Sequence, residues 1–583
     1  MRLNLSSQIV LNKVPVEFYK PKTTVEYSEI SRMEKIHTDI FASMAEGASH
    51  VANKIETGIK AAQQEGKFYV MALGTGSSLY SVYDELVRRY NEKTLSFRNV
   101  VVFNAYEYYP LQKDSSLRTI NQLKDRFLNH VDVAEQNIFT LDGFVAQDAV
   151  QDSCRLYEQR IKTFGGLDVA LIGVGRSGNI AANEPGSGIQ SMTRIILIGN
   201  TSREEMENSE QTKETIPPCS LTMGIATLLS AKSIYLTAWG EEKAEIMQKV
   251  VENSITDTLP ASFLQTHPNA HVVIDLGAAH HLTRIEHPWL VTSCQWSDKL
   301  VRSALVWLCQ KLGKPILKLT NKDYNENGLS ELLALYGSAY NANIKIFNDL
   351  QHTITGWPGG KPNADDTYRP ERATPFPKKV IVFSPHPDDD VISMGGTIRR
   401  GKARTACTYN EIPLDHVHFL DLPFYESGKI EKLPMTEKDV EVVRALLQKV
   451  QPHQIYVAGD LADPHGTHKK CTDAVLAAID EEKKAGAEWL KDCRIWMYRG
   501  AWAEWEIENI EMCVPLSPEE LRAKRNSILK HQSQMESAPF LGNDERLFWQ
   551  RAEDRNRATA SLYDQLGLAC YEAMEAFVEY KPL

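Results

Sequence analysis

A short apolar run that stops in a loop of histidine and aspartate is the feature that most constrains the fold of this chain. Residues 380–383 (Val-Ile-Val-Phe) lead directly into residues 384–390 (Ser-Pro-His-Pro-Asp-Asp-Asp). A β-branched run that ends this way is typical of a buried strand opening into a tight loop. Open α/β sheets bind their ligands at the carboxyl ends of such strands. The sequence therefore predicts an α/β domain with a functional site at this loop.

A second apolar run further along the chain ends in two histidines. Residues 454–459 (Gln-Ile-Tyr-Val-Ala-Gly) precede residues 463–468 (Asp-Pro-His-Gly-Thr-His). His386, Asp389 and His468 offer an ion two imidazoles and one carboxylate, which leaves positions open for water as in a hydrolytic zinc site. We therefore predict that these three side chains bind Zn²⁺ or another divalent metal. The alternative is that the loop residues only cap the helices that follow.

Residues 375–583 resemble the LmbE-like (PIG-L) zinc deacetylase superfamily, whose members remove acetyl groups from N-acetylglucosamine-containing substrates. The resemblance assigns the three metal ligands named above. It also implies that Asp388 is the base acting on the zinc-bound water and that His465 is the polarising acid. Thr467 departs from the superfamily, which often carries aspartate between the two histidines. The implied reaction is hydrolysis of an acetamide by a metal-activated water.

The composition narrows the class of function. A chain of 583 residues is long enough for several domains, and 43% apolar with 24% charged residues is typical of globular protein. A net charge of −11 disfavours nucleic acid or an anionic membrane as partner. We see no apolar run near the roughly 18 residues of a membrane span. Nine cysteines without a paired motif, and a polar amino terminus, favour reduced thiols and a cytoplasmic location.

The amino-terminal half alternates short apolar runs with amphipathic helices, which predicts a doubly wound, mostly parallel sheet. The first run ends in a loop of small residues, 74–78 (Gly-Thr-Gly-Ser-Ser), before a helix. Backbone amides and hydroxyls in such a loop can surround an anion, although a tight turn needs glycine in any case. The predicted strands are Phe68–Leu73, Val100–Asn104, Val169–Val174, Ile195–Gly199, Ile234–Trp239 and His271–Leu276.

Longer strings make residues 30–285 similar to the glucosamine-6-phosphate deaminase/isomerase family. They include residues 173–186 (GVGRSGNIAANEPG), 222–229 (TMGIATLL) and 260–268 (PASFLQTHP). The resemblance implies an effector-associated arginine at Arg194. It also implies phosphate contacts at the following residues: Thr75, Gly76, Ser77 and Lys243.

The similarity fails at the positions that carry the family's chemistry. Tyr106 stands where the family has its proton-abstracting aspartate, and Ser177 and Asn179 stand where it has its ring-opening aspartate and histidine. Only Glu184 of the acid–base group remains. Tyrosine and serine are poor bases at pH 7, and asparagine cannot move a proton. We therefore predict that this domain has a sugar-phosphate pocket without ordinary deaminase activity. One alternative is that it catalyses altered isomerase chemistry through Tyr106 or Glu184. The other is that it is a scaffold that only oligomerises.

The predicted architecture is two doubly wound, mostly parallel Rossmann-like domains joined by a helical segment and a Pro/Gly-rich linker. The deaminase-like domain covers residues 1–285, the helical bridge 286–350, the linker 351–377 and the zinc domain 378–583. After Arg400 the chain runs at once into Gly401, where the deacetylase superfamily has a further strand and a substrate loop. We predict that a segment is absent between these two residues.

Together these features predict a zinc hydrolase that deacetylates an N-acetylglucosamine-type amino sugar or a conjugate of one. The first domain would bind a sugar phosphate, as substrate or effector, and assemble a homo-oligomer, with no nucleic acid and no membrane as partner. One alternative is a bifunctional enzyme that also has active glucosamine-6-phosphate deaminase/isomerase chemistry. The other is a non-catalytic sugar-phosphate sensor or scaffold.

Overall fold

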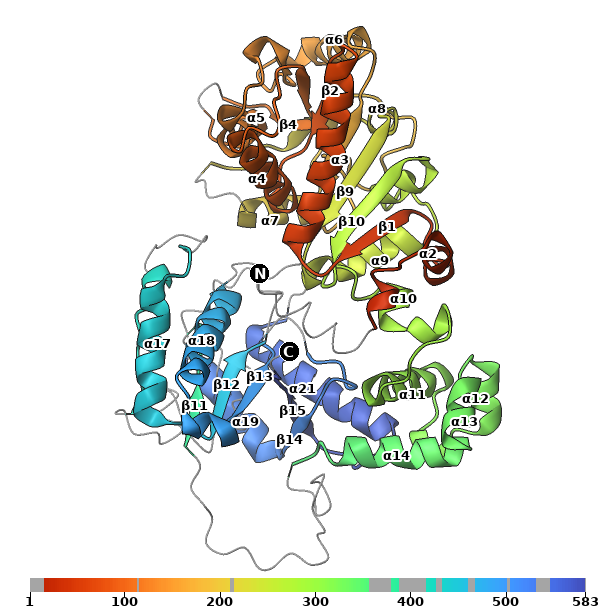
Figure 1. The fold of residues 1–583 in the computed structure, drawn as a ribbon, viewed down its shortest axis with the longest axis vertical. Coiled ribbons are helices and arrows are strands. Elements are labelled where there is room, and N and C mark those ends of the chain that lie inside the picture. Colours follow the sequence, from red (N-terminus) through yellow and green to blue (C-terminus); the bar gives the residue numbers. More distant parts are fainter. Residues whose placement is uncertain are drawn as a thin grey trace, which may run out of the picture. The chain divides into compact units, whose positions relative to one another are not determined.

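The computed structural model divides into two compact units, Met1–Cys294 and Gln295–Leu583 (Figure 1). Most of the linker predicted at 351–377 lies outside the described residues. None of the helices in the described part of the chain is long and apolar enough to cross a membrane. The structure describes residues 15–112, 115–209, 214–355, 379–386, 416–425, 433–459, 467–500, 504–530 and 546–581.

The first unit is built on a seven-stranded sheet in the order β1-β10-β9-β6-β2-β3-β5. Every neighbouring pair in it is parallel. This confirms the predicted parallel α/β fold for the first domain. The strands are β1 (His37–Phe41), β2 (Tyr69–Leu73), β3 (Val100–Asn104), β5 (Ile138–Phe139), β6 (Val169–Gly173), β9 (Ser233–Ala238) and β10 (Ala270–Asp275).

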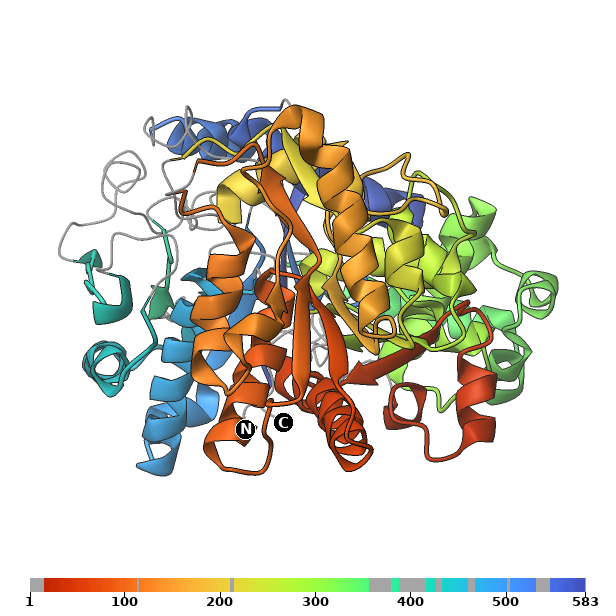
Figure 2. The same ribbon diagram turned by 90° about the horizontal axis from the view of Figure 1, so that it is seen from above.

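Helices cover both faces of this sheet (Figure 2). Along β2, alternate residues enter two different cores: Met71 and Leu73 face one helical layer, whereas Val70 and Ala72 face the other. All residues of β2 are buried, which explains why its sequence is continuously apolar. One layer contains α3 (Met44–Gln64) and α4 (Ser77–Asn91), and the other contains α6 (Val150–Thr163) and α9 (Ala244–Glu252).

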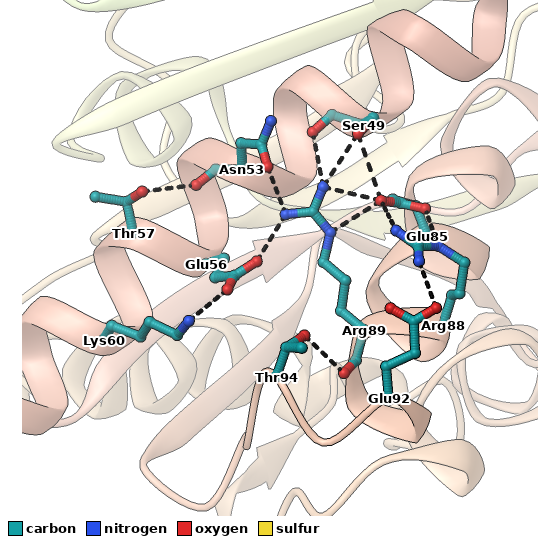
Figure 3. A network of polar contacts seen from close by, with 10 residues as sticks. All are labelled: Ser49, Asn53, Glu56, Thr57, Lys60, Glu85, Arg88, Arg89, Glu92 and Thr94. Carbon is teal, nitrogen blue, oxygen red and sulfur yellow. Dashed lines mark hydrogen bonds and ion pairs between the residues drawn. The ribbon is translucent and has the colours of Figure 1, made fainter.

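A buried arginine holds α3 and α4 together (Figure 3). The guanidinium of Arg89 on α4 donates from Nη1 to Asn53 Oδ1 and Glu56 Oε2, both at 2.7 Å. Its Nη2 donates to Ser49 Oγ at 3.1 Å, and its Nε donates to Glu85 Oε1 at 2.9 Å. Residues 74–78 (Gly-Thr-Gly-Ser-Ser), called here the glycine–serine loop, connect β2 to α4. The network around Arg89 therefore holds in place the helix whose first turn lies at the carboxyl end of the sheet.

A separate antiparallel sheet of three strands follows the order β4-β8-β7. Its strands are β4 (Tyr106–Tyr109), β8 (Cys219–Thr222) and β7 (Arg194–Leu197). The strand predicted at Ile195–Gly199 therefore exists as β7 but pairs antiparallel with β8 instead of joining the parallel sheet. Its exposed, alternating pattern suits an antiparallel strand with one solvated face. Both Tyr106 and Arg194 pair with Thr222, so this small sheet carries two predicted site residues.

The second unit begins with α11 (Asp298–Leu312), α12 (Asn321–Glu326), α13 (Ser330–Tyr336) and α14 (Ala339–Gln351). This segment is bonded to later parts of the same unit: Nη1 of Arg302 on α11 donates to Ile510 O at 3.2 Å, and Thr355 N, shortly after α14, donates to Cys513 O at 2.8 Å. Of the segment predicted as a bridge, 286–350, residues 295–350 thus belong to the second compact unit and residues 286–294 to the first.

The sheet of the second unit has five strands in the order β11-β12-β13-β15-β14. The first three are parallel, whereas β15 pairs antiparallel with both β13 and β14. The strands are β11 (Val380–Val382), β12 (Gln454–Ala458), β13 (Arg494–Tyr498), β14 (Met512–Leu516) and β15 (Ala573–Glu579). The helices of this part are α17 (Glu437–Val450), α18 (Thr467–Lys484), α19 (Pro518–Ile528) and α21 (Phe548–Gln565).

Candidate functional site

The loop after β2 presents backbone amides at the carboxyl end of the sheet. Gly76 is the N-cap of α4 and has φ 133°, a conformation that favours glycine. Glycine has no side chain that could cap the first turn of α4. The amide of Leu79 in that turn donates to Gly76 O at 3.0 Å, so the amides of Ser77 and Ser78 are the ones that could bind an anion. Thr75 and Ser77 flank it and add hydroxyl groups. The structure thus places these three predicted phosphate contacts on one loop.

Tyr106 lies against this loop. Its phenolic oxygen is 2.6 Å from Oγ1 of Thr75, so the two hydroxyls share a hydrogen bond. Tyr106 begins β4, two residues beyond the end of β3, so it too follows a carboxyl end of the parallel sheet. Its ring meets that of Tyr108 edge-on at 6.0 Å. A phenol can donate or accept a hydrogen bond, but the reference pKa of tyrosine, near 10, makes this residue type a poor base at neutral pH.

A second group of predicted residues converges around Ser177. Its Oγ lies 3.0 Å from Asn179 Oδ1 and 3.5 Å from Glu184 Oε2. Asn179 and Glu184 are both buried. Ser202, which the sequence reasoning did not assign, joins the group with its Oγ 3.2 Å from Ser177 Oγ. Ser202 is 1% exposed and comes from α7 (Asn200–Ser209), and no local motif marks it as a neighbour of Ser177.

Two members of this group, Ser177 and Glu184, line a cavity of about 310 Å³. Gly199 forms part of its wall, and a Cβ there would approach Glu184 Oε2 to 3.1 Å, so a larger residue would crowd the carboxylate. The lining residues are Ser177, Glu184, Pro185, Leu197, Ile198, Gly199, Asn200 and Thr201. The hydroxyl, amide and carboxylate groups among these lining residues suit a small hydroxylated ligand.

The loop that carries Lys243 is tied to the glycine–serine loop. Nε1 of Trp239 donates to Ser78 O at 2.7 Å, and Thr237 Oγ1 donates to the same oxygen at 3.2 Å. Gly240 then turns with φ 87°, and its amide donates to Asp275 Oδ1 at 2.9 Å. Lys243 ends the short 3₁₀ segment that leads into α9. The carboxyl ends of β2 and β9 are thereby joined, with a cation on the second loop.

Arg194 occupies a different position. Its Nη1 donates to Asn183 Oδ1 and its Nη2 donates to Ser187 Oγ, both at 2.8 Å. Both acceptors are neutral, and burial lowers the pKa of the guanidinium from its usual range. The hydrogen bonds of Arg194 named here are to Asn183 and Ser187 and not to the glycine–serine loop. The role of Arg194 as an effector-site arginine stays a prediction.

Glu107, the acidic neighbour of Tyr106, is engaged elsewhere. Its Oε1 accepts from Tyr108 N at 3.0 Å and from Thr119 N at 2.9 Å. Thr119 is the first residue of α5 (Thr119–Arg126), so the carboxylate serves the start of that helix. Burial raises the pKa of Glu107 to about 7. Its bonding agrees with the expectation that adjacent strand residues point to opposite sides.

Two of the five metal-site residues predicted in the second unit fall within the described residues. His386 follows β11, and His468 lies in the first turn of α18, shortly after β12. Because β11 and β12 are parallel neighbours, their carboxyl ends lie at the same edge. Nδ1 of His386 is 3.1 Å from Nε2 of His468, which is 3% exposed. Asp388, Asp389 and His465 lie outside the described residues.

The spacing of the two imidazoles fits a common metal ion. Two nitrogen ligands at about 2.0–2.1 Å from a tetrahedral zinc lie about 3.3–3.4 Å apart. The observed separation of 3.1 Å, at which the two rings share a hydrogen bond, is slightly shorter than this value. The ring centroids are 5.0 Å apart and tilted by 54°, so the contact is between ring edges and is not a stack. Imidazole nitrogen is a preferred ligand of Zn²⁺, and the donor set present therefore suits that ion.

The seven-stranded parallel sheet, with its candidate site in the loops at the carboxyl edge, makes the first unit an α/β protein of the parallel-sheet class. Residues 42–273 match the family described as glucosamine-6-phosphate isomerases/6-phosphogluconolactonase. The whole chain is 60% identical, over 663 aligned positions that cover all of both proteins, to a glucosamine-6-phosphate deaminase-like protein of Bacteroides thetaiotaomicron. The chain belongs to this glucosamine-6-phosphate deaminase-like family.

Other relatives match a smaller share of the chain. The glucosamine-6-phosphate deaminase of Oceanobacillus iheyensis is 33% identical over 252 residues, covering 43% of this chain and 97% of that enzyme. A solved monomeric glucosamine-6-phosphate deaminase is 32% identical, with a TM-score of 0.40, and covers 42% of this chain and 99% of its own. These enzymes therefore correspond to less than half of the present chain.

The alignment with the Bacteroides protein is longer than the chain itself. It runs over 663 positions, whereas the chain has 583 residues, so at least 80 positions hold no residue of this chain. A segment absent between Arg400 and Gly401 would account for such positions, and its location stays a prediction.

Proposed function

We propose that the first unit binds a hexosamine phosphate or a closely related sugar phosphate and does not carry out ordinary deamination. The observation that carries the proposal is the hydrogen bond between Tyr106 and Thr75 at the amide-lined loop. The phosphate-type loop keeps its glycine and hydroxyl residues, while a phenol occupies the place where the deaminase family has a carboxylate base. On this proposal the first unit keeps the groups that bind the phosphate but has tyrosine in place of the residue that would remove a proton from the sugar.

Each part of the site has a binding task in this proposal. The amides at the start of α4, with the hydroxyls of Thr75 and Ser77, would donate hydrogen bonds to the phosphate oxygens at the positive end of the helix. Lys243 would add a charge from the neighbouring loop. Glu184 and Asn179 would bond to the sugar hydroxyl or amino groups that reach the cavity. These assignments use recognition chemistry alone and require no base at Tyr106.

Binding can be tested by calorimetry with glucosamine 6-phosphate and with unphosphorylated glucosamine. We expect measurable affinity only for the phosphate, and we expect Lys243→Ala to weaken it by about 10–100-fold, the cost of one charged hydrogen bond. Lys249→Ala is the matched control, because this exposed lysine lies on the following helix and pairs with Glu245. Equal affinity for both sugars, or equal losses in both variants, would exclude the phosphate pocket.

An ammonia-release assay with the same sugar phosphate tests the second half of the proposal. We expect no turnover, because neither Tyr106 nor Ser177 is an effective base at neutral pH. Ammonia release that a chelator leaves unchanged would instead support the bifunctional alternative, with altered isomerase chemistry in the first unit.

We further propose that the second unit is a metal-dependent N-deacetylase acting on an amino sugar or a conjugate of one. The convergence of His386 and His468 supports this function. The two imidazoles, with Asp389, would hold Zn²⁺, which supplies a bound water of lowered pKa. Asp388 would accept the proton from that water, and His465 would donate to the developing oxyanion and to the leaving amine.

Acetate release from N-acetylglucosamine compounds, measured with zinc-loaded and chelator-treated protein, tests this function. We expect activity only with metal, and a loss of roughly 10²–10⁴-fold in Asp388→Asn, as removal of a positioned base requires. Asp390→Asn, two positions further along the sequence, is the matched control and should keep most of the activity. A protein that never binds metal yet binds sugar phosphate tightly would point to the sensor alternative. Light scattering would test the proposed homo-oligomer.

A further inference from the structure

Three histidines surround one aspartate at the amino ends of β1 and β10, the edge opposite to the loops described above. Asp39 on β1 has its Oδ1 3.2 Å from Nε2 of His37. Its Oδ2 lies 3.8 Å from Nδ1 of His271 on β10 and 3.8 Å from Nε2 of His50 on α3. The register of the parallel pair places His37 directly beside His271. This group, called here the His37–Asp39–His271 cluster, plays no part in the proposed sugar-phosphate site.

The ligand atoms of the cluster are close enough for one ion. One atom from each of His37, Asp39 and His271 lies within 4.8 Å of the others. Ligands about 2.0–2.2 Å from a four-coordinate ion lie about 3.3–3.6 Å apart, so small rotations of these side chains would close the site. The side chains are 24–41% exposed, which gives an ion access from solvent.

The orientation of His271 is fixed by its neighbour Asn269. The amide nitrogen of Asn269 donates to Lys232 O at 2.9 Å and to Ser233 Oγ at 2.6 Å. Its oxygen therefore faces Nε2 of His271 at 3.1 Å and accepts a hydrogen bond from it. With Nε2 committed to Asn269, Nδ1 of His271 faces the carboxylate of Asp39. Either a proton on Nδ1 or a metal ion must lie between these two groups.

The rings are also held in place. His271 stacks on Tyr235 with centroids 5.5 Å apart, and His37 packs against Tyr27 at 4.7 Å. An outer hydrogen bond that selects the tautomer, together with a packed ring, is the arrangement that orients metal-binding histidines in proteins. A surface ion pair alone would need neither feature.

We propose that His37, Asp39 and His271 form a second divalent-metal site, with Zn²⁺ the ion that best fits two imidazoles and a carboxylate. His50 lies 3.8 Å from Oδ2 of Asp39, the same oxygen that faces His271, and orients the carboxylate. The ion would connect the edge strand β1 to β10 and, through His50, to α3. It would thereby stabilise the pairing of the edge strand with the rest of the sheet. The proposal does not depend on either activity proposed above.

The test uses the full chain carrying His386→Ala and His468→Ala, which removes the proposed ligands of the second unit. Equilibrium dialysis against Zn²⁺ should then give one ion per chain. Adding Asp39→Asn or His271→Asn should weaken binding by more than the roughly 10–100-fold that loss of an outer-shell partner costs. The matched control is His130→Asn, at an exposed histidine that bonds only to a backbone carbonyl.

Two results would overturn the proposal. One is a background protein that binds no Zn²⁺, and the other is full binding in the cluster variants; in either case a shared proton, and not a metal, separates His271 from Asp39. His37→Asn, at a more exposed position on the edge strand, provides a second variant should His271→Asn fail to fold. Cobalt substitution gives an independent signal, since a Co²⁺ site of nitrogen and oxygen ligands should show visible absorption that the cluster variants lose.

Discussion

At the scale of single residues, Glu107, the neighbour of Tyr106, should make the free energy of unfolding depend on pH. It is 1% exposed, and its burial, opposed in part by two backbone hydrogen bonds, raises its pKa to about 7 from 4.5. As the pH rises from 4.5 towards 7, the unfolded chain loses this proton while the folded chain keeps it. The contribution of Glu107 to stability therefore falls across this interval, by at most about 3 kcal/mol, and is constant above it.

Glu107→Gln should remove this dependence. A glutamine keeps an oxygen that can accept from Tyr108 N and Thr119 N, but it does not ionise. We expect the unfolding free energy of the variant, relative to that of the natural protein, to increase between pH 5 and 7.5. Urea unfolding at four pH values measures this difference, with the exposed Glu17→Gln as control. A difference that stays constant from pH 5 to pH 8 would contradict the raised pKa.

The residues of the candidate site were predictable to different degrees. Thr75, Gly76 and Ser77 follow an apolar run in a glycine loop, and such local patterns identify a turn and an amide cluster without any knowledge of the fold. Ser202 could not be found in this way, because its contact with Ser177 depends on how α7 packs. The same holds for His37 and His271, which come together only through the pairing of β1 with β10.

At the scale of elements, the apolar pattern predicted the central strands and missed the edges. β2, β3 and β6 are buried on both faces, so their sequences are continuous apolar runs. β1 is an edge strand with His37 and Asp39 on its solvated side, and its mixed sequence gave no strand signal. Pairing partners were not predictable either, because the strand formed by Arg194–Leu197 has the right propensity but joins the small antiparallel sheet.

The α3–α4 contact yields a prediction at this scale. Arg89→Met would leave Glu56 and Glu85 without their buried partner, and we expect a loss of about 2–4 kcal/mol in unfolding free energy. Arg88→Met is the matched control on the same helix, because the side chain of Arg88 is 53% exposed and its pairs with Glu85 and Glu92 lie at the surface. That variant should lose less than about 1 kcal/mol. Equal losses in urea unfolding would show that the network in Figure 3 adds nothing beyond surface pairing.

At the scale of the whole molecule, the two cores of the first unit are self-contained. Both helical layers and the seven-stranded sheet come from residues before 295, and the last members of the core are contributed by the short segment after β10. Trp289 and Val291 in that segment are buried, at 7% and 4% exposed. A domain that ends at 285, as the sequence pattern suggested, would lack both side chains, whereas one that ends at 294 would keep them.

We therefore expect a fragment of residues 1–294 to unfold cooperatively and to bind glucosamine 6-phosphate within about threefold of the full chain, because every proposed contact lies inside it. A fragment of residues 1–285 should be less stable by roughly 2–5 kcal/mol, the cost of removing large buried side chains from a packed core. Thermal unfolding followed by circular dichroism, with calorimetric binding, measures both. If the longer fragment aggregates or melts without cooperativity, the first unit is not an independent domain. If the two fragments are equally stable, Trp289 and Val291 do not belong to its core.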